Sequence, residues 1–519
     1  MGWNPFRRPA APAATIERAR QEPRFNLPRS SPALRSFNAA TVDLLTADLP
    51  AVIQSGNAAL RPALRILRSR SRQLAENNDY AREFLRLLSR KVLGPDGIKL
   101  VVRAMRDKTT VDEADSTYLE TSFAEWSKKG TCTVCGLHSW ADVERLALTS
   151  MARDGECLIR LVKGFDGNRF RFALQMIEAD ALDENLNVAR GAGFGGVTMA
   201  ANSEIRMGVE RNPWGRPVAY QILTRHPGDD LGIWTGNVRY TRVPAEEMIH
   251  LFVPDRIGDA RGAPWIWTAI RRLQMIGGYE EAELVASRLA ASKGGFFTEP
   301  TGDEMDAVAS GTDAQGNLIE EAVPGTYTRL PKGVEFTPFD PQHPGANYAG
   351  FIKATLRGAC AGMGVAYHSV SKDLSDVNFS SIRQGELDDR EQFRMIQRFL
   401  IQGLSEQVWD AWLDMGLLSG ALALPPAKRD KFDAANWHPR GWPWVDPTKD
   451  IAAEAEAVAL GIRSRTQICA ERGIDFEDVL RERKREQDLA KQYGVTLSDG
   501  TIPSPGAAAV VQPESESTP

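Results

Sequence analysis

The sequence predicts a multidomain protein of the α+β class. Its 519 residues exceed what one hydrophobic core usually serves, which favours two to four domains. Apolar residues make up 42% of the chain and charged residues 25%, an ordinary globular composition. The spacing of apolar residues changes along the chain from a helical period to β-like runs and back to a helical period. Separate helical and strand-rich stretches of this kind are typical of α+β proteins.

The first half of the chain begins with helices and continues with strands. Residues 1–38 are rich in Pro, Ala and Arg, lack periodicity, and are expected to form a mobile arm. Apolar residues at three- and four-residue spacings predict helices over about Ala58–Val92, Thr110–Trp126 and Ser139–Arg153. A β-rich layer within about 155–255 should pack on these helices, with strands at Cys157–Val162, Phe170–Ile177, Pro217–Leu223 and Met248–Val253.

The second half is mostly helical, with one strand-and-loop insert. A helix is expected after Pro264 and ends at Gly294-Gly295, and residues 295–345 are heavy in Gly, Pro and Asp. The expected elements that follow are a helix at Tyr348–Met363, an irregular polar segment at Ala366–Val377, a long helix at about Asn378–Met415, three short helices up to about Tyr493, and a disordered tail at Ser498–Pro519.

Capping residues mark several of these helix ends. Asn78 or Asp79 can cap a second helix within the first helical stretch, and Gly94-Pro95 stops it. Asp446 is a plausible N-cap, with Pro447 at the first helical position of the C-terminal helices.

Composition excludes several classes of protein. No segment approaches the ~20 apolar residues needed to cross a bilayer, and residues 1–14 lack the apolar core of a signal peptide, so we expect a cytoplasmic protein with no membrane contact. Five cysteines in a chain of this length indicate reduced thiols. The net charge of −5 argues against a protein that coats nucleic acid through clustered Lys and Arg.

Cysteine and histidine offer one candidate for chemistry. Cys132 and Cys135 form a C-x-x-C pair, and His138 follows three residues later. A structural zinc site needs four ligands, and the other cysteines do not repeat the spacing. The alternative interpretation is a turn before the helix at Ser139, with two half-buried thiols. We therefore predict neither a metal nor another cofactor, and no catalytic residue.

Other candidate motifs are weaker. The glycine-rich segment at 191–196 lacks the flanking strand and helix of a phosphate-binding loop and has no Lys-Ser/Thr ending, so a surface loop is expected. Neither His250 nor His368 lies in a recognisable nucleophile motif. His250 ends an apolar strand and is expected to be a satisfied core residue, whereas His368 is expected to be solvated.

Four regions of the chain, taken in order, resemble one family. They are Arg72-Gln-Leu-Ala-Glu-Asn-Asn-Asp-Tyr-Ala-Arg82 with the turn at 92–98, Asp154-Gly155-Glu156 with Gly215-Arg216-Pro217-Val218-Ala219-Tyr220, the segment 243–250 with Arg261-Gly262-Ala263-Pro264-Trp265, and Gly364-Val365-Ala366-Tyr367 with the segments 376–383 and 442–447. Each string alone is a short turn-and-cap pattern. Together they cover roughly residues 60–490, and the chain resembles the lambda-type portal proteins of tailed bacteriophages.

The resemblance implies a subunit with a wing, a two-helix stem, a β-rich clip and a helical crown, in a ring of typically twelve copies. The β-rich insert between two helices fits a clip between stem helices. The implied parts are an arm at 1–38, a wing at 39–270, a first stem helix at 271–293, a clip at 294–345, a second stem helix at 346–364, a channel loop at 365–377, a long wing helix and return at 378–445, a crown at 446–495 and a tail at 496–519.

The resemblance also implies a location and partners. The ring would occupy one capsid vertex of the virion, after assembly in the host cytoplasm, and would serve DNA packaging and ejection. The implied partners are other copies of the chain, the terminase large subunit, head-tail connector or adaptor proteins, the major capsid and scaffold proteins, and double-stranded DNA that passes through while weakly bound.

The implied site is a set of polar side chains at the channel. The loop candidates are Ser369, Ser371, Lys372, Asp373, Ser375 and Asp376, and the stem candidates are Lys353 and Arg357. Twelve copies of Lys372 would form a cationic ring able to touch phosphates, moderated by the acidic neighbours. An ordinary helix connector explains the loop as well, with Asp376 favourable to the dipole of the long helix, and a solvated or intersubunit face explains Lys353 and Arg357.

Two other functions stay open at this point. One is a metal- or thiol-dependent enzyme that uses Cys132, Cys135 and His138, which stoichiometric zinc would indicate. The other is a monomeric DNA-binding adaptor, which a basic face and tight duplex binding would indicate.

Overall fold

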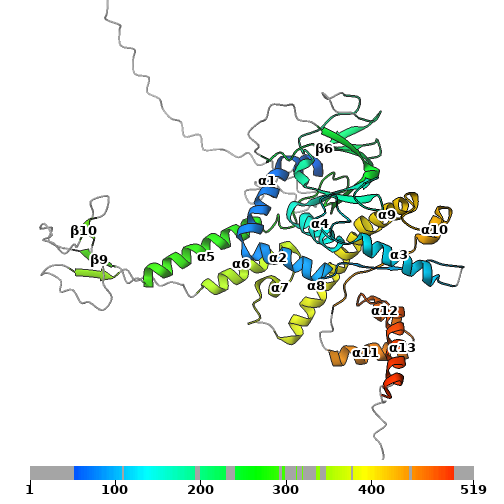
Figure 1. The fold of residues 1–519 in the computed structure, drawn as a ribbon. Helices are drawn as coiled ribbons and strands as arrows, with labels where there is room; N and C mark the ends of the chain where they lie inside the picture. The colour runs from blue at the N-terminus through cyan, green and yellow to red at the C-terminus, as the bar shows by residue number, and fades with distance from the viewer. Residues whose placement is uncertain are drawn as a thin grey trace, which may run out of the picture. The chain divides into compact units, whose positions relative to one another are not determined.

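The computed structural model describes residues 52–107, 110–192, 199–229, 240–291, 295–298, 311–312, 318–319, 335–338, 347–375, 378–442 and 447–495 (Figure 1). The chain divides into two units, Met1–Gln54 and Ser55–Pro519, and the fold below is that of the second unit. The predicted arm at 1–38, the predicted tail at 496–519 and most of the glycine-rich segment at 191–196 lie outside the described residues.

The N-terminal helices confirm the predicted positions. Asn78 caps the second helix, since its side chain accepts a hydrogen bond from the backbone N–H of Ala81, and a π-helical turn then ends at Gly94 with a positive φ of 74°. Ser139 and Asp142 form a capping box at the start of the fourth helix. The elements are α1 (Gly56–Asn77), α2 (Asp79–Leu88), the π turn (Ser89–Leu93), α3 (Glu113–Trp126) and α4 (Trp140–Asp154).

The β-rich layer is present and consists of two antiparallel sheets. In the first sheet, β2 (Glu156–Lys163) lies between β3 (Phe172–Ile177) and β8 (Met248–Phe252). The second sheet has the order β4-β5-β6-β7, with β4 (Glu204–Arg206), β5 (Val209–Arg211), β6 (Pro217–Leu223) and β7 (Tyr240–Pro244). A separate pair joins β1 (Lys99–Val102) to β13 (Ala435–His438).

The hydrophobic core lies between the first sheet and helices from both ends of the chain. Aromatic rings fill its centre: the ring centroid of Phe123 lies 5.1–5.6 Å from those of Trp126, Trp409 and Trp412. Because the indole N–H of Trp126 donates to the carbonyl of Phe172 at 2.9 Å, this buried polar group is satisfied. The core thus joins α3 and β3 to the later helix α9 (Glu406–Leu418).

Helices dominate the second half, as predicted. The predicted long helix is interrupted, because a π turn at Ile401–Ser405 separates α8 (Phe379–Leu400) from α9. A Cβ at Gly403 in this turn would lie 2.8 Å from Leu251 of β8, so the glycine permits the turn to approach the sheet. The other helices are α5 (Ile270–Ala291), α6 (Tyr348–Met363), α7 (Tyr367–Ser371), α10 (Arg429–Phe432), α11 (Pro447–Ala459), α12 (Arg465–Ala470) and α13 (Phe476–Tyr493).

The predicted strand-rich insert contains short strands, of which two antiparallel pairs are described. The strands are β9 (Gly295–Thr298) paired with β12 (Glu335–Pro338), and β10 (Gly311–Thr312) paired with β11 (Leu318–Ile319). Pro447 begins α11 as predicted, whereas the predicted cap Asp446 lies outside the described residues.

Two expectations from composition can be compared with the structure. All five cysteines are free thiols. In the described part of the chain, no helix combines the length and the apolar character that a bilayer crossing requires.

A buried ion-pair network ties α1 to the first sheet and to the segment before α5. The carboxylate of Glu156, at the start of β2, accepts from Arg68 of α1 at 2.7 Å and from Arg261 Nε at 2.7–2.8 Å, and lies 2.8 Å from His250 Nε2 of β8. All four side chains are at most 3% exposed. Arg261 also donates to the backbone carbonyls of Ala179, Leu182 and Met207. His250 is therefore the satisfied core residue that its strand predicted.

Opposing effects act on the titration of this network. Burial alone would raise the pKa of Glu156, but Arg261 and His250 hold it well below its usual range. Burial lowers the pKa of His250 against the opposing effect of Glu156. The network is therefore held by an ionised carboxylate between two guanidinium groups, with a neutral imidazole beside it.

We expect Arg261→Met to lower the free energy of unfolding by about 3–5 kcal/mol, because it leaves the buried carboxylate of Glu156 short of a charge partner. Chemical denaturation at pH 7 measures this loss. Arg169→Met is the matched control, since Arg169 forms an exposed ion pair with Glu125 and its loss should cost about 1 kcal/mol or less. Equal effects of the two substitutions would contradict the role assigned to Arg261.

A second buried carboxyl group predicts a pH dependence. Glu144 of α4 is 1% exposed, accepts from the backbone N–H of Ile98 at 3.1 Å, and has its pKa raised to about 8 by burial. As the pH rises, the carboxyl group of Glu144 loses its proton in the unfolded chain before it does so in the folded chain. The contribution of Glu144 to the free energy of unfolding is therefore most favourable below about pH 4.3. It declines by ~1.4 kcal/mol per pH unit up to about pH 8.

Glu144→Gln should therefore remove this decline. We expect the difference in unfolding free energy between the variant and the wild type to shift in favour of the variant from pH 5 to about pH 8. Denaturation curves at several pH values measure it, with the exposed Glu125→Gln as control. A difference that does not change with pH would show that Glu144 is ionised in the folded protein.

Candidate functional site

The predicted channel residues lie around an antiparallel pair of helices. Arg272 of α5 donates to the carbonyl of Gly358 in α6 at 2.7 Å, and Thr268, just before α5, donates to the carbonyl of Gly362 at 3.0 Å. Toward the other end of the pair, the ring of Tyr279 lies 5.2 Å from that of Phe351. Since the later residues of α5 meet the earlier residues of α6, the helices run in opposite directions. Gly364 ends α6 in the left-handed conformation.

The segment after Gly364 is partly helical, which corrects the prediction of an irregular connector. Residues Tyr367–Ser371 form the short helix α7, whose first turn is held by Asp389 of α8. One carboxylate oxygen of Asp389 accepts from the backbone N–H of Ala366 at 2.9 Å, and the other accepts from the hydroxyl of Ser369 at 2.7 Å. Because this cap comes from a distant helix, local periodicity could not reveal α7.

Asp373 organises the rest of the loop. Its carboxylate accepts from the hydroxyl of Tyr367 at 3.0 Å, from the backbone N–H of Ser375 at 2.9 Å and from the hydroxyl of Ser375 at 2.6 Å. Lys353 of α6 lies 3.1 Å from the same carboxylate and donates to Ser375 at 3.3 Å. Hydrogen bonds from Ser375 and Lys353 hold the pKa of Asp373 well below its usual range, so this carboxylate is ionised at neutral pH.

Lys372, the only cation of the loop, is also engaged. It adopts a positive φ of 60°, and its ammonium lies 2.9 Å from the carboxylate of Glu83 in α2 and donates to the carbonyl of Ser369 at 2.9 Å. Glu83 pairs with Arg90 as well, at 2.5 Å. The side chain of Lys372 is nevertheless 56% exposed, so solvent reaches its charge.

The remaining predicted residues pack within the same region. The guanidinium of Arg357 lies 5.4 Å from the ring centroid of Tyr367, and the hydroxyl of Ser371 accepts from the backbone N–H of Asp373 at 3.1 Å. His368 is not simply solvated: its Nε2 is buried without a hydrogen-bond partner among the described residues. Asp376 lies outside the described residues.

The structure therefore brings half of the predicted residues into one cluster. We call Lys353, Tyr367, Lys372, Asp373 and Ser375 the loop cluster. Each of its cations lies beside a carboxylate, Lys353 beside Asp373 and Lys372 beside Glu83. Sequence reasoning missed Glu83, Tyr367 and Asp389, and no pattern near the loop points to them. Of the two lysines, Lys372 is exposed and Lys353 is half-buried. Each could attract a phosphate, but the adjacent carboxylate opposes that attraction.

The C-x-x-C pair does not form a ligand set. Cys132 is buried, its thiol lies 3.3 Å from the carbonyl of His138, and burial raises its pKa to about 12. Cys135 is exposed, so the expectation of two half-buried thiols is wrong for both. Among the described residues neither thiol belongs to a group of three potential metal ligands. A thiol with a raised pKa is a poor nucleophile and a poor ligand.

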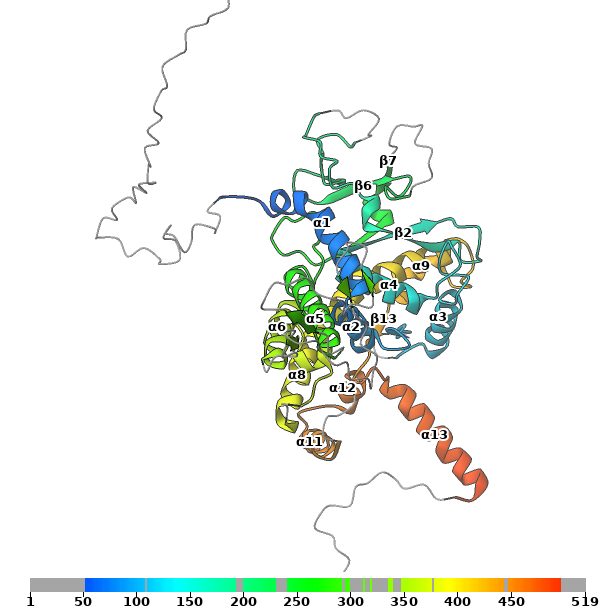
Figure 2. The same cartoon turned by 90° about the vertical axis from the view of Figure 1, so that its left-hand side faces the viewer.

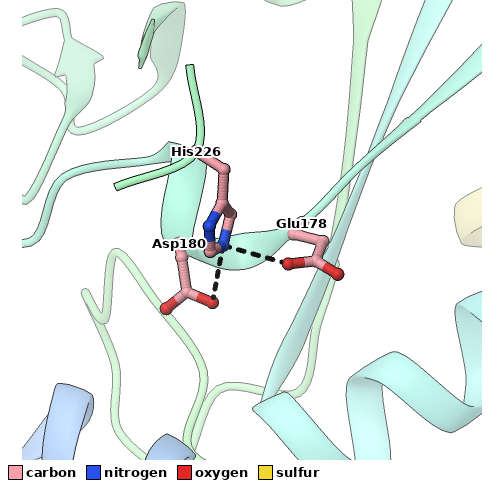
Figure 3. A group of neighbouring side chains, drawn as sticks. All are labelled: Glu178, Asp180 and His226. Atoms are coloured by element: carbon pink, nitrogen blue, oxygen red, sulfur yellow. Dashed lines mark ion pairs between the residues drawn. The ribbon is translucent and has the colours of Figure 1, made fainter. Parts of the chain in front are cut away.

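One group of potential ligands lies elsewhere. His226 Nε2 is 3.0 Å from a carboxylate oxygen of Glu178 and 3.6 Å from one of Asp180 (Figure 3). Asp180 already contacts Arg68 at 2.9 Å and Arg72 at 2.5 Å. Two guanidinium groups beside the same carboxylate repel a divalent cation, so this group is better explained as the outer end of the Glu156 network.

The comparisons with known proteins agree on one family. The model of the family described as phage portal protein, lambda family, matches residues 44–397. A probable portal protein of Halomonas phage phiHAP-1 is 35% identical over 456 residues, covering 87% of this chain and 85% of that protein. Portal protein B of Escherichia phage lambda is 22% identical, covering 83% of this chain and 85% of that protein.

Solved structures include a similar chain from the neck of an empty gene transfer agent particle. Its sequence identity is 12%, its TM-score is 0.41, and the match covers 79% of this chain and 94% of that chain. The family assignment rests instead on the family model and on the phiHAP-1 relative, which span most of the sequence. This chain belongs to the lambda family of phage portal proteins.

Proposed function

We propose that this portal protein forms a homo-oligomeric ring, typically of twelve copies, at one capsid vertex, and that the ring is the channel for DNA packaging and ejection. The family membership carries this proposal. The helices α5 and α6 would be the two stem helices at 271–293 and 346–364, and the strands between them would form the clip at 294–345. The antiparallel packing of α5 on α6 supports this assignment.

The loop at 365–377 is proposed to face the channel. Its contribution is a weak contact with DNA, since a channel must let the duplex slide. Two observations support this: Lys372 is more than half exposed, and Glu83 lies against its ammonium. A phosphate would have to compete with that carboxylate, so no single contact would hold the duplex firmly.

The remaining parts of the proposal concern partners and location. The clip would dock the terminase large subunit during packaging, and the ring would later bind the head-tail connector, while the capsid and scaffold proteins surround it. Assembly would take place in the host cytoplasm, and the finished protein would be part of the virion. The protein would act by forming a channel and docking surfaces, without catalysis. The raised pKa of the Cys132 thiol supports this proposal over a thiol enzyme.

Electron microscopy and native mass measurement of the purified protein test the ring. We expect closed rings of about twelve subunits with a hole wide enough for a DNA duplex. A protein that remains monomeric at high concentration and binds duplex DNA tightly would instead be a DNA-binding adaptor, and one that binds stoichiometric zinc would be a metalloprotein.

A pair of substitutions tests the balance at the channel loop. Glu83→Gln removes the carboxylate beside Lys372, so rings of this variant should bind duplex DNA more tightly. The slope of log affinity against log salt, measured from about 50 to 200 mM, should steepen by about 0.9 for each additional phosphate that the ring neutralises.

The double variant Glu83→Gln/Lys372→Ala separates the two cations that Glu83 neutralises. If Lys372 binds the additional phosphate, the double variant should return to the affinity of the wild type. If the affinity stays high, the released Arg90 binds the DNA instead, and the assignment of Lys372 to the channel is wrong.

A further inference from the structure

In the described structure, the C-terminal helices α11, α12 and α13 share no fully buried apolar side chain. Of residues 447–495, the only side chain that counts as buried in the described structure is that of Asp475, which is 4% exposed. Large apolar side chains are exposed instead: Leu460, Ile462, Leu480, Leu489 and Tyr493 are 44–75% exposed. In proteins most helical stability comes from packing of an apolar face, so the exposed apolar side chains of these helices indicate a surface outside the single chain.

Among the described residues, the ion pairs between α13 and the preceding parts of the chain lie at the beginning of the helix. Lys99 of β1 pairs with Asp478 at 2.8 Å, and Arg103 pairs with Asp475 at 3.0 Å. These pairs lie in the first turn of the helix and just before it. From residue 480 to residue 489 every side chain of α13 is exposed. Figure 2 shows α13 as one continuous helix.

Two stripes of opposite charge run along the exposed part of α13. The basic stripe consists of Leu480, Lys484, Gln487 and Lys491, and the acidic stripe consists of Glu482, Glu486, Leu489 and Tyr493. Each stripe has the spacing i, i+4, i+7, i+11, which places its members on one face of a helix. Because the stripes are offset by two residues, they lie about 200° apart, on opposite sides of the helix.

The charged side chains of both stripes have no ion-pair partner in the part of the chain that the structure describes. Among the described residues, Lys484, Lys491, Glu482 and Glu486 form no ion pair. Each stripe also has exposed apolar surface, from Leu480 on the basic side and from Leu489 and Tyr493 on the acidic side. A face that combines apolar surface with charge of one sign suits a partner that combines apolar surface with charge of the other sign.

We propose that the basic stripe of α13 docks against the acidic stripe of α13 in a neighbouring copy of the chain. This inference rests on the proposed ring, and it names a contact that closes it. In a ring, each subunit meets its neighbours through two different surfaces, which must be complementary to each other. The two stripes meet that condition on a single helix: each copy offers one stripe to either side.

The contact explains how the C-terminal helices obtain a core. Because neighbouring copies in a ring are related by rotation, adjacent copies of α13 run in nearly the same direction, and Lys484 of one copy would lie opposite Glu482 and Glu486 of the next. Leu480 lies about one turn before this contact and Leu489 about one turn after it, so both would be covered as the helices pack side by side. The arrangement resembles the charged flanks that set partner choice in coiled coils. The apolar core of this region would then form between subunits.

Charge reversal tests the contact. In Lys484→Glu/Lys491→Glu both stripes are acidic, and in Glu482→Lys/Glu486→Lys both are basic. Each variant alone should need a roughly tenfold or higher concentration to assemble, since like charges meet at every interface. Mixed in equal amounts, the two should assemble again, because an acidic stripe then always meets a basic one. Native mass measurement should find rings with equal numbers of the two chains.

The matched control is Arg481→Glu/Arg485→Glu, which reverses two charges on the side of α13 between the stripes. It should assemble like the wild type. Full-length chains are used throughout, and circular dichroism checks that each variant retains its helix content.

The outcomes separate the proposed contact from the proposed ring. If both reversed variants form rings as readily as the wild type, or if mixing does not restore assembly, the stripe contact is wrong and the ring stands. If Lys484→Glu/Lys491→Glu assembles normally but binds duplex DNA less well, the basic stripe faces DNA and the inference also fails. A wild-type protein that forms no ring would overturn the proposed function itself.

Discussion

The buried carboxylate of Glu156 is the constraint on which the described fold depends. An ionised carboxylate without solvent access is very costly unless opposite charges and hydrogen-bond donors surround it. Here Arg68 and Arg261 supply the charges and His250 a further hydrogen bond, from three separate elements. The elements are therefore fixed relative to one another at one point. Arg261 extends this constraint to three backbone carbonyls, so that both sheets of the β-rich layer are held by the same guanidinium.

The contact between Glu156 and Arg261 also explains two of the sequence segments that resemble the portal family, 154–156 and 261–265. A Cβ at Gly155 would overlap the backbone of Gly262, and a Cβ at Gly262 would overlap the carbonyl of Gly155. Glycine at both positions lets the Asp-Gly-Glu turn and the Arg-Gly-Ala-Pro-Trp segment touch through their backbones, and Trp265 then donates to the carbonyl of Ala152 at 2.9 Å. The two strings are thus halves of one contact, with Glu156 and Arg261 beside it.

Sequence reasoning predicted what local patterns determine. The caps at Asn78 and Ser139, the strands β6 and β8 and the helix α6 followed from spacing and turn residues, and the family followed from the order of the strings. What it missed depends on partners far away in the chain: α7 is capped by Asp389, and Lys372 pairs with Glu83. The parts named wing, clip and crown, and the channel-facing role of the loop, stay predictions.

The pairing of Lys372 with Glu83 alters the physical picture of the channel. A ring of lysines without carboxylate partners would attract the phosphates of DNA wherever the duplex stood in the channel. The duplex would dissociate from the lysines more slowly as more phosphates were bound. With a carboxylate against each ammonium, DNA in the proposed channel would have to displace that carboxylate before it could bind, so the net attraction at each lysine would be small. Weak binding of DNA would then result from competition between Glu83 and phosphate for Lys372 within each subunit, as well as from the single lysine of each loop. The exposed stripes of α13 follow the opposite logic, because among the described residues their charges have no ion-pair partner, and in the proposed contact they would find one in the next subunit.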